Sequence, residues 1–483
     1  MPTATLLFPP RPSGAALALG YLLAGLLPLA LGYGQSVSAA HPWELAGAAL
    51  GLMALVGMAV QFVTSGRFES ASGRLGIDRI MAFHKLAAHW LAVAVVLHPL
   101  LYVVPTWMAD PALGWMRLQF YLTAPDYRTG VVALAALLVL VVSSILRERL
   151  PMRYEGWRAV HVVLALVVVF GGLHHAVAVG RFSAQGPVET LWWVTGALVL
   201  AVMATLYGYR WWRLHHRPWR LAGITPLADR MWELDIQPRP GTPQPRYHAG
   251  QFVWMTEGNR RFPLFDHPFS IADSPERPGL SLIIKEAGDF TNQIGTLPPG
   301  RVIGIDGPYG EFTLESHDAQ ALLLIGGGVG IAPIIGLVRD MAARGDRRPV
   351  RVVYAAGHPQ NFARLDELRA AESTLDMRLM PIAEQGAPGW QGEIGLLDRD
   401  RLQRLLTGLD PKTTVAMMCG PGPMVVKVSD TLLDLGLPTH NVIYERFDYG
   451  GGPTSRQDRA RTWKMLAVGG VLAAAAAGFA AVG

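Results

Sequence analysis

The stretch HKLAAHWLAVAVVLHPLLY, residues 84–102, places three histidines inside a run that is apolar enough to cross a membrane. Imidazole is costly to bury in hydrocarbon, so a histidine at that depth needs a partner or a function. His84 and His98 are 14 residues apart, and on a helix this spacing leaves them within roughly 40° of each other. His89 projects roughly 140° away from His84. The stretch therefore predicts a membrane helix with His84 and His98 on one face.

A second apolar run, residues 159–180, repeats this spacing. His161 and His175 are also 14 residues apart, so they too share one face of a helix. His174 would point off that face unless a π-bulge near Gly171 and Gly172 rotated the helix. His174 therefore stays open as an alternative to His175.

The two histidine pairs define two levels in the membrane. If both helices run outward, His84 lies level with His161 and His98 level with His175, about 21 Å apart along the helix axes. Two neutral imidazoles that face each other are suitable ligands for a b-type haem and need no thiolate. Hydrogen-bonding groups or a proton pathway are the alternatives. The matched spacing favours two bis-histidine haems.

The composition also indicates a membrane protein. Of 483 residues, 51% are hydrophobic and only 16% are charged, and the mean hydropathy is +0.27. The formal charge of +5 gives no case for nucleic-acid binding. Cys419 is the single cysteine of the sequence, which excludes an intramolecular disulfide and an iron–sulfur cluster held by four thiolates.

Six apolar segments precede residue 212, and each is near the ~20 residues that span a bilayer. Arginine-rich connections alternate with arginine-poor ones, so the positive-inside rule places the rich ones, and both ends of this bundle, in the cytoplasm of a cell with an inner or plasma membrane. A further apolar tail, residues 465–483, predicts a seventh span, and a packed or amphipathic tail is the alternative. The six segments are residues 14–33, 43–64, 80–105, 129–146, 159–180 and 189–209.

From about residue 217 the sequence reads as soluble. Alternating strands come first, and from 321 to 445 buried strands alternate with helices, which predicts an antiparallel β-barrel followed by an α/β domain. The expected domains are a haem bundle (1–212), an FAD barrel (217–316), a nucleotide domain (317–449) and an apolar helix (464–483).

Two segments of the barrel offer groups whose chemistry would suit a flavin, the cofactor that the resemblance described below implies. The motif HPFSI lies between two strands and offers an aromatic and a hydroxyl group, which suit the ring of a flavin. Downstream, IIKEAGDFT supplies a cation and a glycine turn, which suit a pyrophosphate. The residues are His267, Pro268, Phe269, Ser270, Ile271, Lys285, Gly288 and Thr291.

A nucleotide site is expected where a buried strand meets a helix in ALLLIGGGVGIAPIIGLVRDM. Glycines there let a phosphate approach the backbone at the helix N-terminus. The loop lacks the GxGxxG pattern, because Ile331 stands where that pattern requires glycine. The loop glycines are Gly326, Gly327, Gly328 and Gly330.

These features together resemble the ferric reductase/NADPH oxidase family. The HX13H pairs and the run YEGWRAVH (154–161) are similar to its transmembrane domain, and HAVAVG after His175 fits its pattern better than a ligand at His174. HPFSI, GGGVGIAP and CGPGPM (419–424) resemble flavin and nicotinamide motifs of its ferredoxin–NADP reductase-type module.

The resemblance implies roles for individual residues. Phe269 and Ser270 would contact the flavin ring, and Cys419 and Gly420, with Pro421, would lie beside the nicotinamide. Phe447, in IYERFDYG, would be the late aromatic that covers the flavin, although this chain continues for over thirty residues beyond it. Ser270, Cys419 and Phe447 are the expected catalytic residues.

The sequence thus predicts a transmembrane oxidoreductase. Electrons would pass from cytoplasmic NADPH or NADH through FAD and two b-type haems to an outer acceptor, either a ferric chelate, dioxygen or a redox protein. The acceptor is expected near residues 106–128, which include Trp107, Trp115, Arg117 and Tyr121. Arg364 could bind the 2′-phosphate of NADPH. The alternative is a membrane-anchored flavin reductase whose bundle is an anchor or haem sensor.

Overall fold

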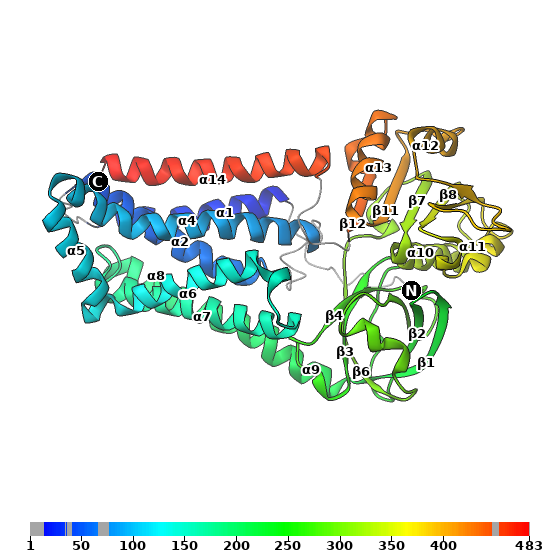
Figure 1. Cartoon of the computed structure of the whole chain (residues 1–483), viewed down its shortest axis with the longest axis horizontal. Helices are drawn as coiled ribbons and strands as arrows, with labels where there is room; N and C mark the ends of the chain where they lie inside the picture. The colour runs from blue at the N-terminus through cyan, green and yellow to red at the C-terminus, as the bar shows by residue number, and fades with distance from the viewer. Residues whose placement is uncertain (1–13, 34, 36–40, 66–76, 447–453, 483) are drawn as a thin grey trace, which may run out of the picture. The chain divides into compact units, whose positions relative to one another are not determined.

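The computed structural model describes residues 14–33, 35, 41–65, 77–446 and 454–482. The chain divides into two compact units. The helical unit comprises Met1–Gly208 and Thr462–Gly483, and the sheet unit comprises Tyr209–Arg461. Figure 1 shows the long helices of the first unit and the two sheets of the second.

The helical unit is a bundle of long apolar helices. Within the described residues, seven helices are long and apolar enough to cross a membrane. The last of them begins within the sheet unit and ends in the bundle. They are α1 (Gly14–Tyr33), α2 (Pro42–Val63), α4 (Ile77–Ala109), α6 (Arg128–Ile145), α7 (Tyr154–Val179), α8 (Gly186–Met203) and α14 (Arg456–Val482).

Helix α2 forms the centre of the bundle, and α14 packs into the same core. Ala49 and Leu52 of α2 are buried with Trp192 of α8. Phe479 of α14 lies 5.3 Å from Phe182, measured between ring centroids. The C-terminal apolar segment therefore joins the bundle core through its side chains.

Two details of the helices were not predicted, a short helix after α4 and a π-helical turn after α8. A short helix, α5 (Pro111–Thr123), follows α4, and Asp110 caps it by accepting hydrogen bonds from Ala112 N at 2.9 Å and Leu113 N at 3.1 Å. Helix α7 is a regular α-helix through Gly171 and Gly172. A π-helical turn occurs instead at Ala204–Tyr209, between α8 and α9 (Arg210–His216).

The first half of the sheet unit is a six-stranded antiparallel sheet with the strand order β4-β3-β6-β1-β2-β5. A bridge between Ile271 and Leu282 joins its two edges, which curls the sheet towards a barrel. HPFS itself forms the edge strand β4, whereas the sequence suggested a segment between strands. The strands are β1 (Trp219–Ala228), β2 (Met231–Pro238), β3 (Phe252–Glu257), β4 (His267–Ser270), β5 (Leu280–Lys285) and β6 (Val302–Tyr309).

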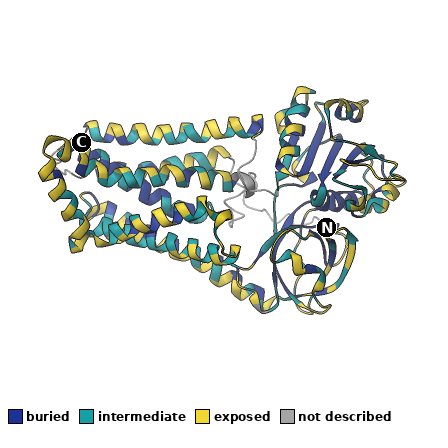
Figure 2. Ribbon diagram, in the orientation of Figure 1, coloured by how far each residue is buried: buried dark blue, intermediate teal, exposed yellow. Residues whose placement is uncertain are grey.

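The second half is a parallel sheet with the order β10-β9-β8-β7-β11-β12. Its central strands β8, β7 and β11 are buried, as Figure 2 shows, because helices cover both faces. The elements are β7 (Ala321–Gly327), α10 (Ile331–Arg344), β8 (Val350–Ala356), α11 (Leu365–Ala371), β9 (Met377–Ala383), β10 (Glu393–Ile394), α12 (Arg399–Leu406), β11 (Thr414–Gly420), α13 (Gly422–Asp434) and β12 (Val442–Arg446).

Candidate functional site

His98 of α4 and His175 of α7 face each other inside the bundle. Their ring centroids are 6.4 Å apart and the ring planes are nearly perpendicular, at 86°. Two metal–nitrogen bonds of about 2 Å, with half an imidazole at each end, need a separation of roughly this size. The two rings therefore fit a single metal centre held between them.

The tautomer of His98 also suits metal ligation. Its Nδ1 lies 2.7 Å from the carbonyl oxygen of Gly47 on α2. A carbonyl only accepts hydrogen bonds, so Nδ1 carries the proton and Nε2 keeps its lone pair. Gly51 leaves room for this ring, because a Cβ atom there would lie 2.8 Å from His98 Nδ1.

His175 occupies a similar cradle on the opposite side. A Cβ atom at Gly130 of α6 would lie 2.6 Å from His175 Nδ1. That nitrogen is buried and has no hydrogen-bond partner in the described part of the chain. His174 is exposed, and its Nδ1 lies 3.1 Å from the Thr129 hydroxyl. The structure thus brings His175, and not His174, to His98.

The second pair, His84 and His161, lies one level away on the same two helices. The two imidazoles are close enough to interact electrostatically. Ser144 Oγ donates to the Leu140 carbonyl at 2.7 Å, so at 3.3 Å it accepts a hydrogen bond from His161 Nδ1–H. This leaves His161 Nε2 available as a ligand.

The surroundings of this pair fit a porphyrin as well. Arg147 lies 5.5 Å from the ring centroids of both Tyr154 and Trp157, and Trp157 lies 5.2 Å from the ring of His161. These groups offer aromatic surface and a cation suited to a porphyrin carboxylate. His89 is exposed and bonds to the Lys85 carbonyl at 2.6 Å, so it is separate from the paired histidines.

Beyond His98 and His175, tyrosine rings lead towards α5. The ring centroids of Tyr102 and His98 are 5.5 Å apart, and those of Tyr127 and His175 are 5.9 Å apart. Tyr121 contacts both tyrosines, at 6.4 and 5.0 Å. Trp107 and Trp115, which the sequence placed in the same region, pack against each other at 5.6 Å.

An ion-pair cluster that sequence reasoning missed holds this region together. The buried carboxylate of Glu44, on α2, pairs with Arg117 of α5 at 2.7 Å and with Arg181, which follows α7, at 2.6 Å. Arg117 also donates to the Tyr121 hydroxyl at 3.2 Å. Glu44, Arg117 and Arg181 together carry a net positive charge, and we call them the outer clamp, after the side of the membrane that the sequence predicts for them.

In the barrel, Phe269 and Ser270 lie on the edge strand β4, where Ser270 is buried. His267 stacks on Phe290 with the ring centroids 4.3 Å apart and the planes 7° from parallel. Phe290 also lies 6.3 Å from Phe269. Phe290 is thus an additional aromatic group beside the HPFSI motif, and its place in the GDFT turn gave no signal in the sequence.

In the turn expected to bind a pyrophosphate, two backbone N–H groups are already hydrogen-bonded within the turn. Lys285 is exposed at the end of β5. The Thr291 hydroxyl accepts hydrogen bonds from Ala287 N at 2.9 Å and Gly288 N at 3.0 Å. These two backbone donors are therefore engaged within the turn.

The glycine loop lies at a topological switch point of the parallel sheet. Strands β8, β9 and β10 extend on one side of β7 and strands β11 and β12 on the other, so the carboxyl ends of β7 and β11 form the crevice where such sheets bind ligands. A Cβ atom at Gly330 would lie 2.1 Å from the Cys419 carbonyl oxygen. Gly328 has φ +56° and open space around its Cα, which permits a phosphate to approach the backbone.

The turn after β11 completes this crevice. A Cβ atom at Gly327 would lie 3.0 Å from Pro421, and one at Gly420 would lie 3.1 Å from the Cα atom of Gly327. The Cys419 side chain is fully buried in the core of the domain, so the Cys419 position would reach a ligand through its backbone. Phe447 lies outside the described residues.

Arg364, the candidate for a 2′-phosphate, is engaged elsewhere. Its guanidinium bonds to the Glu233 carboxylate of the barrel, with Nε at 2.7 Å. Arg339 bonds to the same carboxylate at 2.9 Å, and Ser281 donates to it. Burial raises the pKa of Glu233, but the Ser281 hydrogen bond and the two arginines outweigh it and lower that pKa. This cluster joins the barrel to the α/β domain.

Comparison with known proteins identifies three domain families in the chain. Residues 50–172 match the ferric reductase like transmembrane component, residues 222–313 an FAD-binding domain, and residues 324–430 the oxidoreductase NAD-binding domain.

Among curated proteins, the chain is 31% identical over 208 residues to a probable dihydroorotate dehydrogenase B (NAD(+)), electron transfer subunit, from Methanothermobacter thermautotrophicus. It is 27% identical over 266 residues to a flavohemoprotein from Bordetella pertussis. These matches cover 43% and 53% of this chain and 67% and 65% of the relatives, so the chain spans about two thirds of their length. A crystal structure of flavohemoglobin from Malassezia yamatoensis, with bound FAD and heme, aligns with a TM-score of 0.46 and 17% identity, over 76% of this chain and 98% of that one.

A membrane component fused to FAD-binding and NAD-binding domains defines a membrane flavoprotein oxidoreductase. The chain belongs to the oxidoreductases with the ferric reductase/NADPH oxidase-like architecture, in agreement with the resemblance found in the sequence.

Proposed function

We propose that the chain is a transmembrane NAD(P)H oxidoreductase that takes electrons from a cytoplasmic nicotinamide nucleotide and delivers them to an acceptor on the outer side of the membrane. FAD and two b-type haems would be its bound groups. The pairing of His98 with His175 carries the proposal, because two imidazoles at 6.4 Å, one of them with a fixed tautomer, suit an iron ligand pair. When bound, FAD accepts a two-electron hydride and releases single electrons, which haem iron requires.

The bundle would hold one iron at each level. His98 and His175 would ligate the outer one, with the Gly47 carbonyl orienting His98. His84 and His161 would ligate the inner one, with Ser144 orienting His161. A hydrogen bond to the second ring nitrogen fixes the orientation of a ligating histidine and raises its basicity.

The sheet unit would bind the flavin and the nucleotide. Phe269 would lie against the flavin ring and Ser270 would offer it a hydrogen bond. The glycine loop from Gly326 to Gly330 would hold the nucleotide phosphates, opposite the backbone at Cys419–Pro421, in the crevice of the switch point.

We assign residues 1–212 to the haem component, 217–316 to the FAD barrel, 317–449 to the nucleotide domain and 464–483 to a seventh span. The arginine-rich connections favour a cytoplasmic sheet unit and an integral protein of the inner or plasma membrane. The acceptor, a ferric chelate or dioxygen, would approach the tyrosines and the outer clamp. The net positive charge of that clamp favours an anionic chelate over a cation.

The test is the haem content and reducibility of the purified full-length chain. We expect two b-type haems per flavin, both reduced by NADH or NADPH under anaerobic conditions. His98→Ala should leave one haem and abolish outer acceptor reduction, whereas His89→Ala should keep both haems. A flavoprotein with no haem that still oxidises NADH would contradict the proposal and support a membrane-anchored flavin reductase. Suppression of acceptor reduction by superoxide dismutase would identify dioxygen as the acceptor rather than ferric iron.

A further inference from the structure

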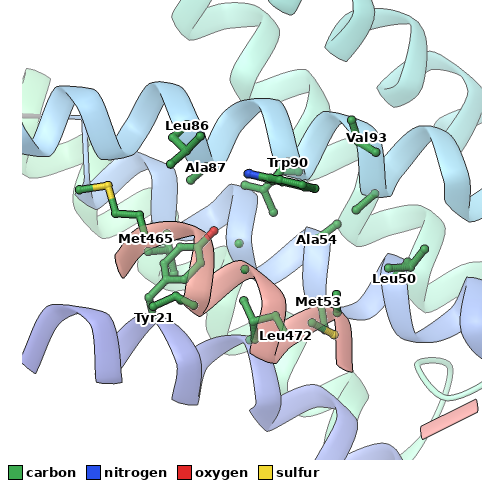
Figure 3. Close-up of a pocket in the computed structure, with 18 of the residues that line it drawn as sticks. Tyr21, Leu50, Met53, Ala54, Leu86, Ala87, Trp90, Val93, Met465 and Leu472 are labelled. Atoms are coloured by element: carbon green, nitrogen blue, oxygen red, sulfur yellow. The ribbon is translucent and has the colours of Figure 1, made fainter. Parts of the chain in front are cut away.

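A cavity of about 210 Å³ lies within the helical unit, between α1, α2, α4 and α14. Figure 3 shows Tyr21 of α1, Ala54 of α2, Trp90 of α4 and Leu472 of α14 around it. It is separate from the four paired histidines, none of which lines it. Nothing in the proposed electron path uses this space.

The cavity exists because small side chains face it from all four helices. Gly25, Ala54, Ala87 and Gly469 come from α1, α2, α4 and α14 in turn. At Gly469 an added Cβ atom would meet nothing within 4 Å. Close packing normally fills such a space with larger side chains, so the hollow leaves room for another molecule.

The lining is apolar and opens to the outside of the bundle. Among the described residues that line it, none is charged. Trp90 and Val93 line the cavity and are also 54% and 51% exposed. All four helices are long and apolar enough to cross a bilayer, so this opening faces hydrocarbon rather than water.

Two lysines precede, in the sequence, residues that line one end of the cavity. Leu86 and Met465 lie together at one end in Figure 3, and Leu50 and Val93 lie towards the other. Lys85 and Lys464 directly precede Leu86 and Met465 in the sequence, and both lysines are exposed. Basic residues at the end of a membrane helix attract anionic headgroups, which matches a phosphate at this end and a hydrocarbon chain inside.

We propose that this cavity is a binding site for a membrane phospholipid, with one acyl chain between α4 and α14 and the phosphate near Lys85 and Lys464. The lipid fills the space between α14 and the rest of the bundle, so it stabilises the seventh helix in place. This inference depends on the bundle lying in a bilayer and does not depend on haem ligation or on the identity of the acceptor.

The experiment uses two neighbouring glycines of α14. Gly469 lines the cavity, whereas Gly470 is exposed and does not line it, and an added Cβ atom at either position would meet nothing within 4 Å. Gly469→Leu places a side chain where the acyl chain would lie, and Gly470→Leu is the matched control with the same change in helix propensity. The full-length protein, extracted in a mild detergent, is analysed by native mass spectrometry and by phosphorus content.

We expect one phospholipid per chain in the wild-type protein and in Gly470→Leu, and about tenfold lower occupancy in Gly469→Leu. Should Gly469→Leu fail to fold, Ala473→Leu in the cavity and Ala474→Leu outside it form a second matched pair. Equal lipid retention in the cavity variants and their controls would overturn the proposal. So would a wild-type protein without lipid, or one that holds a quinone in place of a phospholipid. Haem content, measured on the same samples, reports on the proposed function separately.

Discussion

The replacement Gly130→Ala tests the outer histidine pair without touching either histidine. An alanine Cβ atom at this position would lie 2.6 Å from His175 Nδ1, whereas ordinary contacts begin at 3.4 Å. The imidazole must therefore move by about 0.8 Å, or α6 and α7 must separate by that amount. A displacement near 1 Å is large for a ligand that must be positioned within a fraction of an ångström.

The variant should nevertheless fold. Overpacking of this size costs about 1–3 kcal/mol, and the change from glycine to alanine inside a helix returns about 1 kcal/mol. We therefore expect a folded protein that has lost the outer haem and kept the inner one, because His84 and His161 lie about 21 Å away along the helices. Reduction of the outer acceptor should fall by at least about a hundredfold, while flavin reduction by NADH is unchanged.

The assay is the ratio of haem to flavin in the purified protein, followed by anaerobic reduction with NADH. Gly196→Ala is the control, because its added Cβ atom would meet Leu173 at 3.4 Å, an ordinary contact. Two haems per flavin and full acceptor reduction in Gly130→Ala would refute the assignment of His175 as an iron ligand.

Three further changes probe other parts of the chain. Glu44→Gln removes the carboxylate of the outer clamp and leaves two partly exposed arginines without their counter-charge, so the free energy of unfolding should fall by about 2–3 kcal/mol in thermal or denaturant unfolding. Gly330→Ala drives a methyl group into the Cys419 carbonyl, so the KM for the nucleotide should rise at least about tenfold in anaerobic flavin reduction. Burial raises the pKa of Glu315, but the hydrogen bond with His248 and nearby charges outweigh it and lower the pKa to about 2. The unfolded chain, with its carboxyl near 4.5, binds more protons between these values, so this contribution to stability is present above pH 4.5 and is lost as the pH falls through 2. Glu315→Gln should therefore flatten the loss of stability across that range in acid unfolding curves.

Control variants distinguish these specific effects from a non-specific loss of stability or activity. Glu189→Gln changes a half-buried glutamate at the start of α8, and because glutamine keeps a side-chain oxygen that can accept from Trp193 Nε1, stability should stay within about 0.5 kcal/mol of wild type. Gly223→Ala, with open space around its Cα, should leave the KM unchanged. An unaltered unfolding midpoint in Glu44→Gln would exclude the outer clamp as a structural element, and an acid profile of Glu315→Gln identical to wild type would exclude the pKa assignment.

Periodicity alone located the helices and the shared faces of the histidines, because both depend on local spacing. The positions of His84, His98, His161 and His175 followed from a 14-residue repeat on two helices. The choice between His174 and His175 could not be made from spacing with certainty, since it depends on the regularity of α7 around Gly171. The added helix α5 was missed because its 13 residues lack the length of a span.

Long-range partners explain most of what the sequence did not reveal. Arg364 looked suitable for a phosphate because its partner, Glu233, is 131 residues away in the barrel. The link between Glu44 and Arg181 joins residues 137 apart. The sequence of the turn at Gly288 suggested free backbone donors for a pyrophosphate. In the structure the Ala287 and Gly288 N–H groups donate to the Thr291 hydroxyl. The sequence drew attention to Arg364 and to the Gly288 turn without revealing these partners, whereas the Glu44 cluster was missed altogether.

Helix α2 connects the outer clamp to His98. Glu44 pairs with Arg117 one helical turn from Gly47, whose carbonyl accepts the hydrogen bond from His98 Nδ1–H. A bound anion that paired with Arg117 or Arg181 would weaken the ion pair with Glu44 and shift the Gly47 carbonyl. The hydrogen bond to His98 would change, and with it the electron density that the imidazole donates to a ligated metal. Binding of an anion at the outer clamp would then change the midpoint potential of a metal ligated by His98. An anionic acceptor that binds there would in this way alter the driving force for its own reduction.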